Sequence, residues 1–241
     1  MTTISKVIIV TIIGLLLSSC KMDINFSGIK GNGNVITKER SITEDFNTIK
    51  VSRGLNVYIT QGNSQKLTVE ADENLHDIII TEIAGNTLTV TTDKSIGKAA
   101  AKKVYITLKN IEYIKSSSGS NVMSTNVIST HELKLESSSG SDIELEVDVE
   151  TLDCQSSSGG NVVLKGRTDN FYAEASSGSD IKAKNLKTVS AQAKASSGAN
   201  IALNATEKLS AKASSGADIK YYGNPKIIEI NNSVSGSIRK R

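Results

Sequence analysis

Asparagine and aspartate alternate along this chain at a spacing that could serve metal binding or side-chain hydrogen bonding. Each stands two residues after a glycine, in phrases such as SSSGSDI. The pairs are Gly119 and Asn121, Gly140 and Asp142, Gly159 and Asn161, Gly178 and Asp180, Gly198 and Asn200, and Gly216 and Asp218. Carboxylate oxygens are ligands for calcium, whereas an amide beside a carboxylate can donate a hydrogen bond to it. The phrase returns every 18 to 21 residues.

The alternation favours a hydrogen-bonded ladder over a metal site. If one repeat is one coil of a stacked β-structure, neighbouring side chains in the column lie ~4.8 Å apart. Two carboxylates at that distance would repel by ~1 to 3 kcal/mol. An intervening asparagine doubles their separation and offers an amide donor to the carboxylate on either side. A coil built from two repeats would instead stack aspartate on aspartate and need a cation between them.

Calcium-binding β-rolls differ from this pattern, because their repeat is nine residues long and several oxygens converge on each ion. Here one aspartate occurs per two repeats. We therefore expect a structural ladder, no metal and no cofactor.

The residues around each glycine predict the strands that position this column. Three places after the glycine the chain has Val122, Ile143, Val162, Ile181, Ile201 and Ile219. Five places after it are Ser124, Leu145, Leu164, Ala183, Leu203 and Tyr221, and five places before it are Ile114, Leu135, Cys154, Ala173, Ala193 and Ala211. These columns share one parity of an alternating strand and predict the core, with Cys154 as an inert core residue.

The opposite parity is polar and predicts a solvated face: four places before the glycine are Lys115, Glu136, Gln155, Glu174, Lys194 and Lys212. Each unit reads as a strand, a tight Ser-Ser-Gly corner in which glycine adopts a positive φ, a second strand and a looser return. A period near 20 residues is typical of a solenoid. We predict an all-β, parallel β-helix-like solenoid with coils of about 20 residues.

The start of the chain predicts export. Lys6 precedes the apolar run VIIVTIIGLLL, and Leu17-Ser18-Ser19-Cys20 resembles the lipobox of bacterial lipoproteins. Residues 1–19 then form a signal peptide, and a lipid on Cys20 attaches the mature protein to a membrane. An ordinary signal peptide ending near a cysteine is the alternative. Lys21, where no aspartate follows Cys20, favours the outer membrane or cell surface over the inner membrane.

The rest of the chain divides into three parts. Residues 20–40 predict a tether and a first strand, residues 41–115 an N-terminal β subdomain, and residues 116–241 the β-helix repeats. Within the subdomain, FNTIKVSRGLNVYI fits the coil pattern with Gly54 at the corner and Asn56 in the ladder. EIAGNTLTV predicts a hairpin, and KSIGKAAAKK a loop or brief helical turn. The subdomain would cover one open edge of the β-helix, and Pro225 with Arg239-Lys240-Arg241 could close the other.

The order of these motifs resembles the auto-transporter adhesin head family, also called the head GIN domain. The resemblance rests on GNGNVITKER followed by Phe46, then IKVSRGLNVYI, EIAGNTLTV and the run of GSN, GSD and GAN corners, over roughly residues 30 to 238. It implies a right-handed β-helix-like fold, a lipoprotein or secreted location, a role in cell adhesion and assembly as a homotrimer. It supplies no catalytic residues. Ser235-Gly236-Ser237-Ile238 lacks the ladder asparagine, which predicts an incomplete final coil.

Composition and motifs argue against two functional classes. The formal net charge is +3, and aromatic residues make up 4% of the chain. The sequence shows no basic face interleaved with aromatic residues, so we expect no nucleic-acid binding. His76 and His131 have no nucleophile motif nearby and predict surface or turn positions, so we expect no enzyme. Two functions remain: adhesin-like binding of a surface, matrix or glycan component, or a structural role in the cell envelope. A polysaccharide-acting enzyme is a third alternative, which needs paired carboxylates in a cleft.

Overall fold

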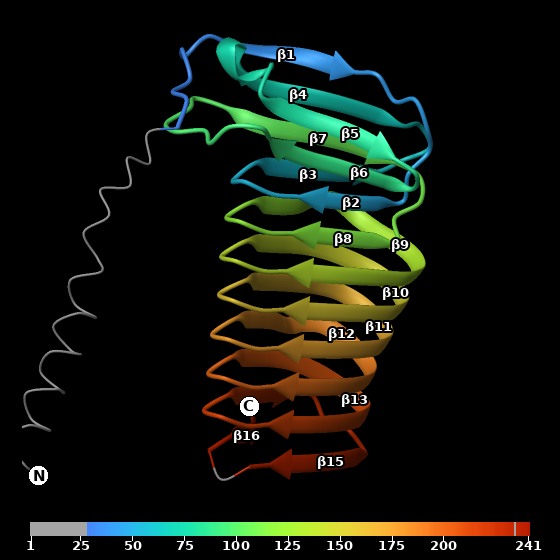
Figure 1. Ribbon diagram of the computed structural model, residues 1–241. Coiled ribbons are helices and arrows are strands. Elements are labelled where there is room, and N and C mark those ends of the chain that lie inside the picture. The colour runs from blue at the N-terminus through green and yellow to red at the C-terminus, as the bar shows by residue number, and fades with distance from the viewer. Residues whose placement is uncertain (1–27, 234) are drawn as a thin grey trace, which may run out of the picture.

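Parallel strands stacked in successive coils make up most of the molecule (Figure 1). The structure is a computed structural model that describes residues 28–233 and 235–241, so the predicted signal peptide and Cys20 lie outside the described residues. Five long strands form the centre of the stack: β9 (Asn121–Ser137), β10 (Asp142–Ser156), β11 (Asn161–Ala175), β12 (Asp180–Ala195) and β13 (Asn200–Ala213). The prediction of an all-β solenoid is confirmed.

The pairing register shows that one repeat is one coil. Asn161 of β11 lies opposite Asp142 of β10 and Asp180 of β12, and both pairings are parallel. Each coil therefore advances by about the predicted 20 residues. A wide coil of two repeats, which would have placed aspartate against aspartate, does not form.

The predicted apolar columns fill the interior of the coils. All six β-branched residues after the tight corners are at most 1% exposed: Val122, Ile143, Val162, Ile181, Ile201 and Ile219. On the opposite side of the interior, Leu135, Cys154 and Ala173 are buried and stacked in register. Burial raises the pKa of the Cys154 thiol, which keeps it protonated and unreactive.

The return corner differs from the looser segment that the sequence predicts. Each of β9 to β13 runs without interruption from one tight corner to the next, over 14 to 17 residues. The register shifts between Glu144 and Glu146 and between Val163 and Lys165, close to the bend. Bulges bend a strand while most of its hydrogen bonds persist, so the chain turns here within one strand.

The N-terminal region begins the stack and covers its upper end (Figure 1). Its strands are β1 (Val35–Arg40), β2 (Thr48–Val51), β3 (Asn56–Gln61), β4 (Lys66–Asp72), β5 (Ile79–Ala84), β6 (Thr87–Thr92), β7 (Lys102–Leu108) and β8 (Tyr113–Ser116). β2 and β3 form a coil around Gly54 and pair in parallel with β8 and β9. Above them, β5 pairs antiparallel with β6, and β4 with β7 and β1. The change of direction ends the parallel stack.

Local predictions in this region hold in part. The hairpin at residues 84–87 joins β5 and β6, and residues 94–101 form a loop in which Ile96 makes an isolated bridge with Ile29. The sequence analysis missed a short 3₁₀ helix, η1 (Glu73–Leu75). A single helical turn has too few residues for a detectable apolar period.

At the lower end, β14 (Asp218–Tyr222), β15 (Ile227–Asn232) and β16 (Ser237–Lys240) continue the stack. β15 pairs with β13, and β16 pairs with β14, both in parallel. Ser237 lies opposite Asp218, in the place of the absent ladder asparagine. Arg239 and Lys240 thus add a layer, and the prediction that they close the edge is wrong.

Two glycines should differ in how strongly alanine destabilises the fold. Gly178 has φ +67, and a Cβ there would meet no other atom. Gly178→Ala should therefore lower the free energy of unfolding by about 1 kcal/mol, the cost of placing alanine in the left-handed conformation. Gly166 has φ +108, and a Cβ there would overlap the Val147 carbonyl oxygen of the preceding coil. We expect Gly166→Ala to lower the free energy of unfolding by at least twice as much in urea titrations. Equal losses would contradict the close stacking at the return corner.

Candidate binding surface

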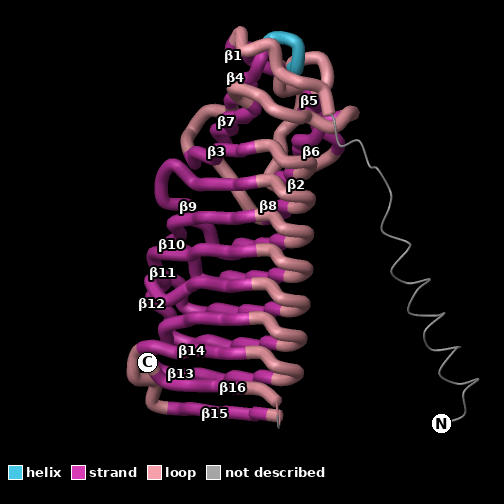
Figure 2. The backbone as a smooth tube through the Cα atoms, turned by 90° about the vertical axis from the view of Figure 1, so that its left-hand side faces the viewer, coloured by secondary structure: helices cyan, strands magenta, loops and turns pink. Residues whose placement is uncertain are grey.

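The tight corners form a column along one edge of the molecule (Figure 2). In the six corners from Gly119 to Gly216 both the serine and the glycine have positive φ, for example Ser177 at 52° and Gly178 at 67°, and around Gly54 the serine is replaced by Arg53. Two successive left-handed residues are typical of a type I′ turn. The sequence predicted this conformation for glycine alone, because it is uncommon for a residue with a side chain.

Backbone hydrogen bonds join each tight corner to the next and hold the serines in this conformation. The Gly159 N–H donates to the Ser177 carbonyl at 3.2 Å, and the Gly178 N–H donates to the Ser197 carbonyl at 3.0 Å. Buried serine hydroxyls add further bonds between coils, such as Ser141 Oγ to the Ser116 carbonyl at 2.7 Å. These backbone bonds and serine hydroxyls make the corner a stacking device.

The asparagine and aspartate side chains form a ladder next to these corners. Asn161 Nδ2 donates to Asp142 Oδ1 at 2.9 Å, and Asn200 Nδ2 donates to Asp180 Oδ1 at 2.9 Å. Each of these two carboxylates receives one amide, from the coil that follows it. The expectation of an amide donor on either side is wrong, because the Nδ2 of each asparagine bonds toward the preceding coil only.

The two ends of the ladder are completed by other groups. Asn121 Nδ2 donates to Asn56 Oδ1 at 2.8 Å, which extends the ladder into the coil around Gly54. At the other end, Asp218 receives Arg239 at 3.1 Å and Lys220 at 3.0 Å. Burial raises the pKa of Asp218, but these bonds outweigh burial and lower it. Among the described residues no group of three or more His, Cys, Asp or Glu could hold a metal ion.

The variable outward residues lie on the wall formed by the strand segments that precede the tight corners, here called the pre-corner wall. One row along this wall is the polar column predicted from sequence, Lys115, Glu136, Gln155 and Glu174. A second row, not identified in the sequence analysis, consists of Tyr113, Lys134, Asp153, Tyr172 and Gln192. The row can be read from the sequence, because each of its residues lies two positions before a member of the first column and therefore has the same outward parity.

A charged cluster at the upper part of the wall fixes several of these side chains. Glu136 accepts from Lys115 and from Lys134, each at 3.0 Å, and from the Tyr113 hydroxyl. Burial raises the pKa of Glu136, but the three hydrogen bonds outweigh it and lower the pKa to about 2. Lys134 also lies 5.4 Å from the centre of the Tyr113 ring. Glu136 therefore stays ionised and holds both lysines in place.

Shallow hollows follow one another along the pre-corner wall. The largest, here called the Tyr172 hollow, has a volume of about 680 Å³ and is lined by Glu112, Thr130, His131, Glu132, Leu133, Lys134, Thr151, Asp153 and Tyr172. A second of about 250 Å³ lies along Lys115, Glu136, Gln155 and Glu174. A third of about 420 Å³ continues over β12, β13 and β15. Tyr172 is 47% exposed at the first hollow.

The two histidines have different surroundings. His131 has a 71% exposed side chain, and its Nε2 lies 2.9 Å from the Glu150 carboxylate, consistent with the predicted surface position. His76 follows η1, as a turn residue would, but it is buried. Its Nε2 lies 3.1 Å from the Ile36 carbonyl, so the predicted turn is correct and the alternative of a surface position is wrong.

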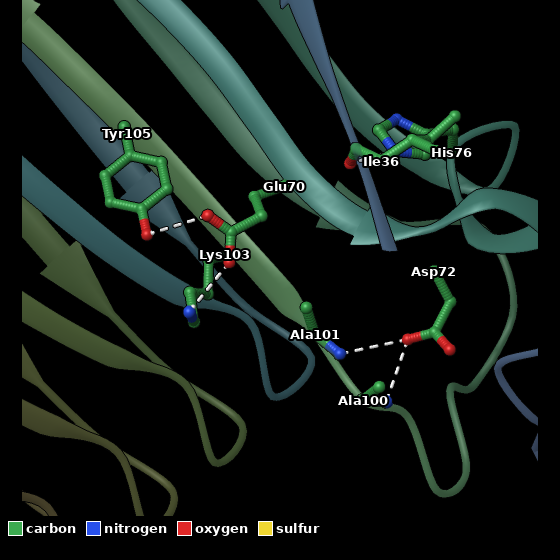
Figure 3. A network of polar contacts seen from close by, with 8 residues as sticks. All are labelled: Ile36, Glu70, Asp72, His76, Ala100, Ala101, Lys103 and Tyr105. Atoms are coloured by element: carbon green, nitrogen blue, oxygen red, sulfur yellow. Dashed lines mark hydrogen bonds and ion pairs between the residues drawn. The ribbon is translucent and has the colours of Figure 1, made fainter. Parts of the chain in front are cut away.

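Buried polar groups in the N-terminal region serve the fold (Figure 3). The Asp72 carboxylate accepts the N–H groups of Ala101 at 2.9 Å, Ala100 at 2.8 Å and Gly33 at 2.6 Å. The Ala101 bond contributes most to lowering the pKa of Asp72. Nearby, Glu70 accepts from Lys103 at 2.8 Å and from the Tyr105 hydroxyl at 3.2 Å. These contacts tie two loops to strands β4 and β7 and leave little for a ligand.

Comparison with known proteins identifies the family. Residues 45–225 match the family described as "putative auto-transporter adhesin, head GIN domain". The match spans well over half of the chain, so the chain belongs to this family. Its membership points to a location at the cell surface or in the envelope. No match was found among curated proteins, and no helix among the described residues is long and apolar enough to cross a membrane.

Solved structures share the fold. A "putative adhesin" from Bacteroides fragilis NCTC 9343 is 25% identical, with a TM-score of 0.82, and the alignment covers 89% of this chain and 100% of that one. A "putative adhesin" from Parabacteroides merdae ATCC 43184 is 22% identical, with a TM-score of 0.73, covering 88% and 98%. A "putative lipid binding protein" from Parabacteroides distasonis ATCC 8503 is 23% identical, with a TM-score of 0.72, covering 88% and 99%.

The ladder can be tested by charge. Asn161→Asp would place three carboxylates in consecutive coils and remove the amide that Asp142 accepts. We expect a loss of about 1 to 3 kcal/mol in unfolding free energy at pH 7 and low salt, shrinking with added salt and below pH 4. Gln192→Glu is the control, since it adds the same charge between Tyr172 and Ser210. Equal stability of Asn161→Asp and the parent at pH 7 would show that these carboxylates do not interact.

The Glu136 cluster predicts a specific pH dependence. Because the pKa of Glu136 is lowered in the folded state, its stabilisation is complete above the unfolded value near pH 4 and lost as the pH falls towards 2. Glu136→Gln should cost about 1 to 3 kcal/mol at pH 7, and the difference from the parent should vanish between pH 5 and 2. Denaturant titrations across this range measure it. Glu174→Gln, which removes no ion pair among the described residues, should show no such trend. A pH-independent loss for Glu136→Gln would contradict the assignment.

Proposed function

We propose that this chain is a lipid-anchored, adhesin-like protein of the cell envelope that binds a glycan along the pre-corner wall. The observation that carries the proposal is the Tyr172 hollow, where a half-exposed aromatic ring stands beside a row of hydrogen-bonding side chains. Further hollows on the same wall extend the surface across successive coils. An elongated ligand fits such a surface better than a compact one.

The composition of the Tyr172 hollow favours a polyhydroxylated ligand. Sites for small apolar molecules are deep and mostly lined by hydrophobic side chains, whereas this hollow is shallow and combines Leu133 and the Tyr172 ring with charged and hydroxyl-bearing side chains. The hydroxyls of Thr130 and Thr151 and the carboxylate of Asp153 offer donors and acceptors for sugar hydroxyls. The Tyr172 ring offers an apolar face to the C–H groups of a sugar ring.

Charge narrows the class of glycan. Glu112, Glu132 and Asp153 line the hollow, while its one lysine, Lys134, is paired with Glu136. A sulfated or uronic-acid chain would meet uncompensated negative charge. The preferred ligand is therefore a neutral or amine-bearing glycan.

The proposed role is binding without catalysis. His131 is highly exposed and paired with Glu150, and the acidic residues of the wall are distributed over separate coils in regular rows. The alternative of a structural envelope protein makes no use of Tyr172 or of the Tyr172 hollow. The polysaccharide-acting enzyme predicts cleavage of the bound chain, whereas the proposed adhesin releases it unchanged.

The proposed anchor is a lipid on Cys20, which would attach the protein to the outer membrane or cell surface. Support comes from the apolar run before Leu17-Ser18-Ser19-Cys20 and from the envelope location to which the family points. A lipid chain contributes ~0.8 kcal/mol of membrane binding per buried CH₂ group. Mass spectrometry of the N-terminal peptide and protease treatment of intact cells test this part. An unmodified Cys20, or protection until the cells are lysed, would refute it.

Binding can be tested on a glycan array with the detergent-solubilised full chain. We expect retention of neutral or amine-bearing glycans, no retention of sulfated ones, and recovery of bound oligosaccharides at unchanged length. Tyr172→Ala and Asp153→Ala should each weaken binding about tenfold, equivalent to ~1.4 kcal/mol. Tyr222→Ala, outside the pre-corner wall, is the matched control. Failure to bind any glycan, or equal weakening by all three variants, would overturn the proposal.

A further inference from the structure

The last coil of the solenoid exposes residues at positions that are buried in every coil above it. Ile228 of β15 stacks on Leu209, and Ile230 stacks on Ala211. Leu209 and Ala211 are 0% and 2% exposed, whereas Ile228 and Ile230 are 44% and 46% exposed. Ile227, on the outer side of β15, is 55% exposed. The lower end thus presents an apolar surface formed by three isoleucines of one strand.

The backbone of this end is also free to pair. Within residues 28–233 and 235–241, β15 pairs only with β13 and β16 pairs only with β14, so each has an outer edge without a partner strand. At the upper end, antiparallel strands cover the stack (Figure 1). An edge with unpaired N–H and C=O groups binds another strand most readily. The fitting occupant therefore offers strands as well as apolar side chains.

The charges of the two edge strands select one kind of partner. β15 contains Glu229 and no basic residue, while β16 contains Arg239 and Lys240 and precedes Arg241. Glu229 has a 62% exposed side chain, with its nearest basic group 3.7 Å away on Lys208. A surface with one acidic and one basic edge is complementary to a rotated copy of itself.

A two-fold axis along the strand direction, midway between β15 and β16, brings these edges together. The rotation lays β15 of one copy on β16 of the other, with the strands antiparallel. Glu229 then faces the basic residues 239–241, and Ile228 and Ile230 of both copies enter a shared interior, while Ile227 lies on the outer side. A two-fold axis across the strands would instead place the basic edges against each other, which costs repulsion.

We propose that the lower end, formed by β15 and β16, binds the same end of a second copy of this chain. The interface is isologous, so it closes after two copies. The antiparallel strands of the upper end do not match the parallel strands of the lower end, which disfavours head-to-tail growth, and the charged β16 edge discourages pairing with unrelated strands. The assembly has two pre-corner walls facing outward on one long body, which would give a glycan-binding adhesin two sites. The dimer itself does not depend on the proposed glycan binding.

Photo-crosslinking in cells tests this end with the full chain. A photoreactive amino acid at Ile227 should give a covalent species of twice the monomer mass, with peptides from residues 235–241 attached to it. The same amino acid at Val189, which is 43% exposed in the middle of the stack, should give no such species. Ile230→Lys should reduce the Ile227 adduct at least tenfold. Thermal denaturation verifies that this variant is folded, and Val189→Lys is its matched control.

Charge reversal separates this geometry from other dimers. Glu229→Arg should reduce the adduct, and adding Lys240→Glu and Arg241→Glu to it should restore the adduct. Absence of an adduct, adducts with other proteins only, or an adduct that Ile230→Lys leaves unchanged would each overturn the proposal. A covalent trimer would also overturn it, because an isologous end cannot join three copies.

Discussion

In-register stacking of the coils is the constraint on which the rest of this structure depends. A coil of about 20 residues cannot bury its own apolar side chains, so each coil is stable only against its neighbours. The Ser-Gly corner meets this requirement, since the Gly N–H of one coil donates to the serine carbonyl of the next. The cost of two left-handed residues is offset at every level by that bond and by the buried serine hydroxyls. The same phrase therefore recurs at the six tight corners from Gly119 to Gly216.

This constraint divides the residues of each repeat into two groups. In the six repeats the glycine, the serine before it and the inward β-branched position recur because of stacking, while the ladder position alternates between asparagine and aspartate. The outward residues of the pre-corner wall vary from coil to coil, because they lie outside the core and take no part in the corner bonds. Tyr172, Asp153 and His131 occur there and nowhere in the repeated phrase. Binding by this protein is accordingly attributed to the wall and not to the corner.

The features that follow from the repeat length and from the alternation of inward and outward residues could be predicted from the sequence. Coil length, the inward columns and the pairing of Asn161 with Asp142 and Asp180 all follow from positions counted relative to glycine. Features set by three-dimensional context were missed: the left-handed serines depend on bonds from the adjacent coil, and the burial of His76 depends on packing against β1. The direction of each ladder amide is likewise decided by local geometry, which the residue types do not encode. The Tyr172 row was missed although its parity was readable, because only the positions nearest the glycine were compared.

Hydroxyl-radical footprinting of the protein, with and without a neutral glycan retained on the array, tests most directly whether the wall is the binding surface. Tyr172 is the informative probe, since the residue is 47% exposed in the free protein. The account predicts that the glycan slows oxidation of Tyr172 severalfold and leaves Tyr222 and Met123 unchanged. Protection of Met123 or Tyr222 with no change at Tyr172 would contradict it and place the ligand elsewhere on the solenoid.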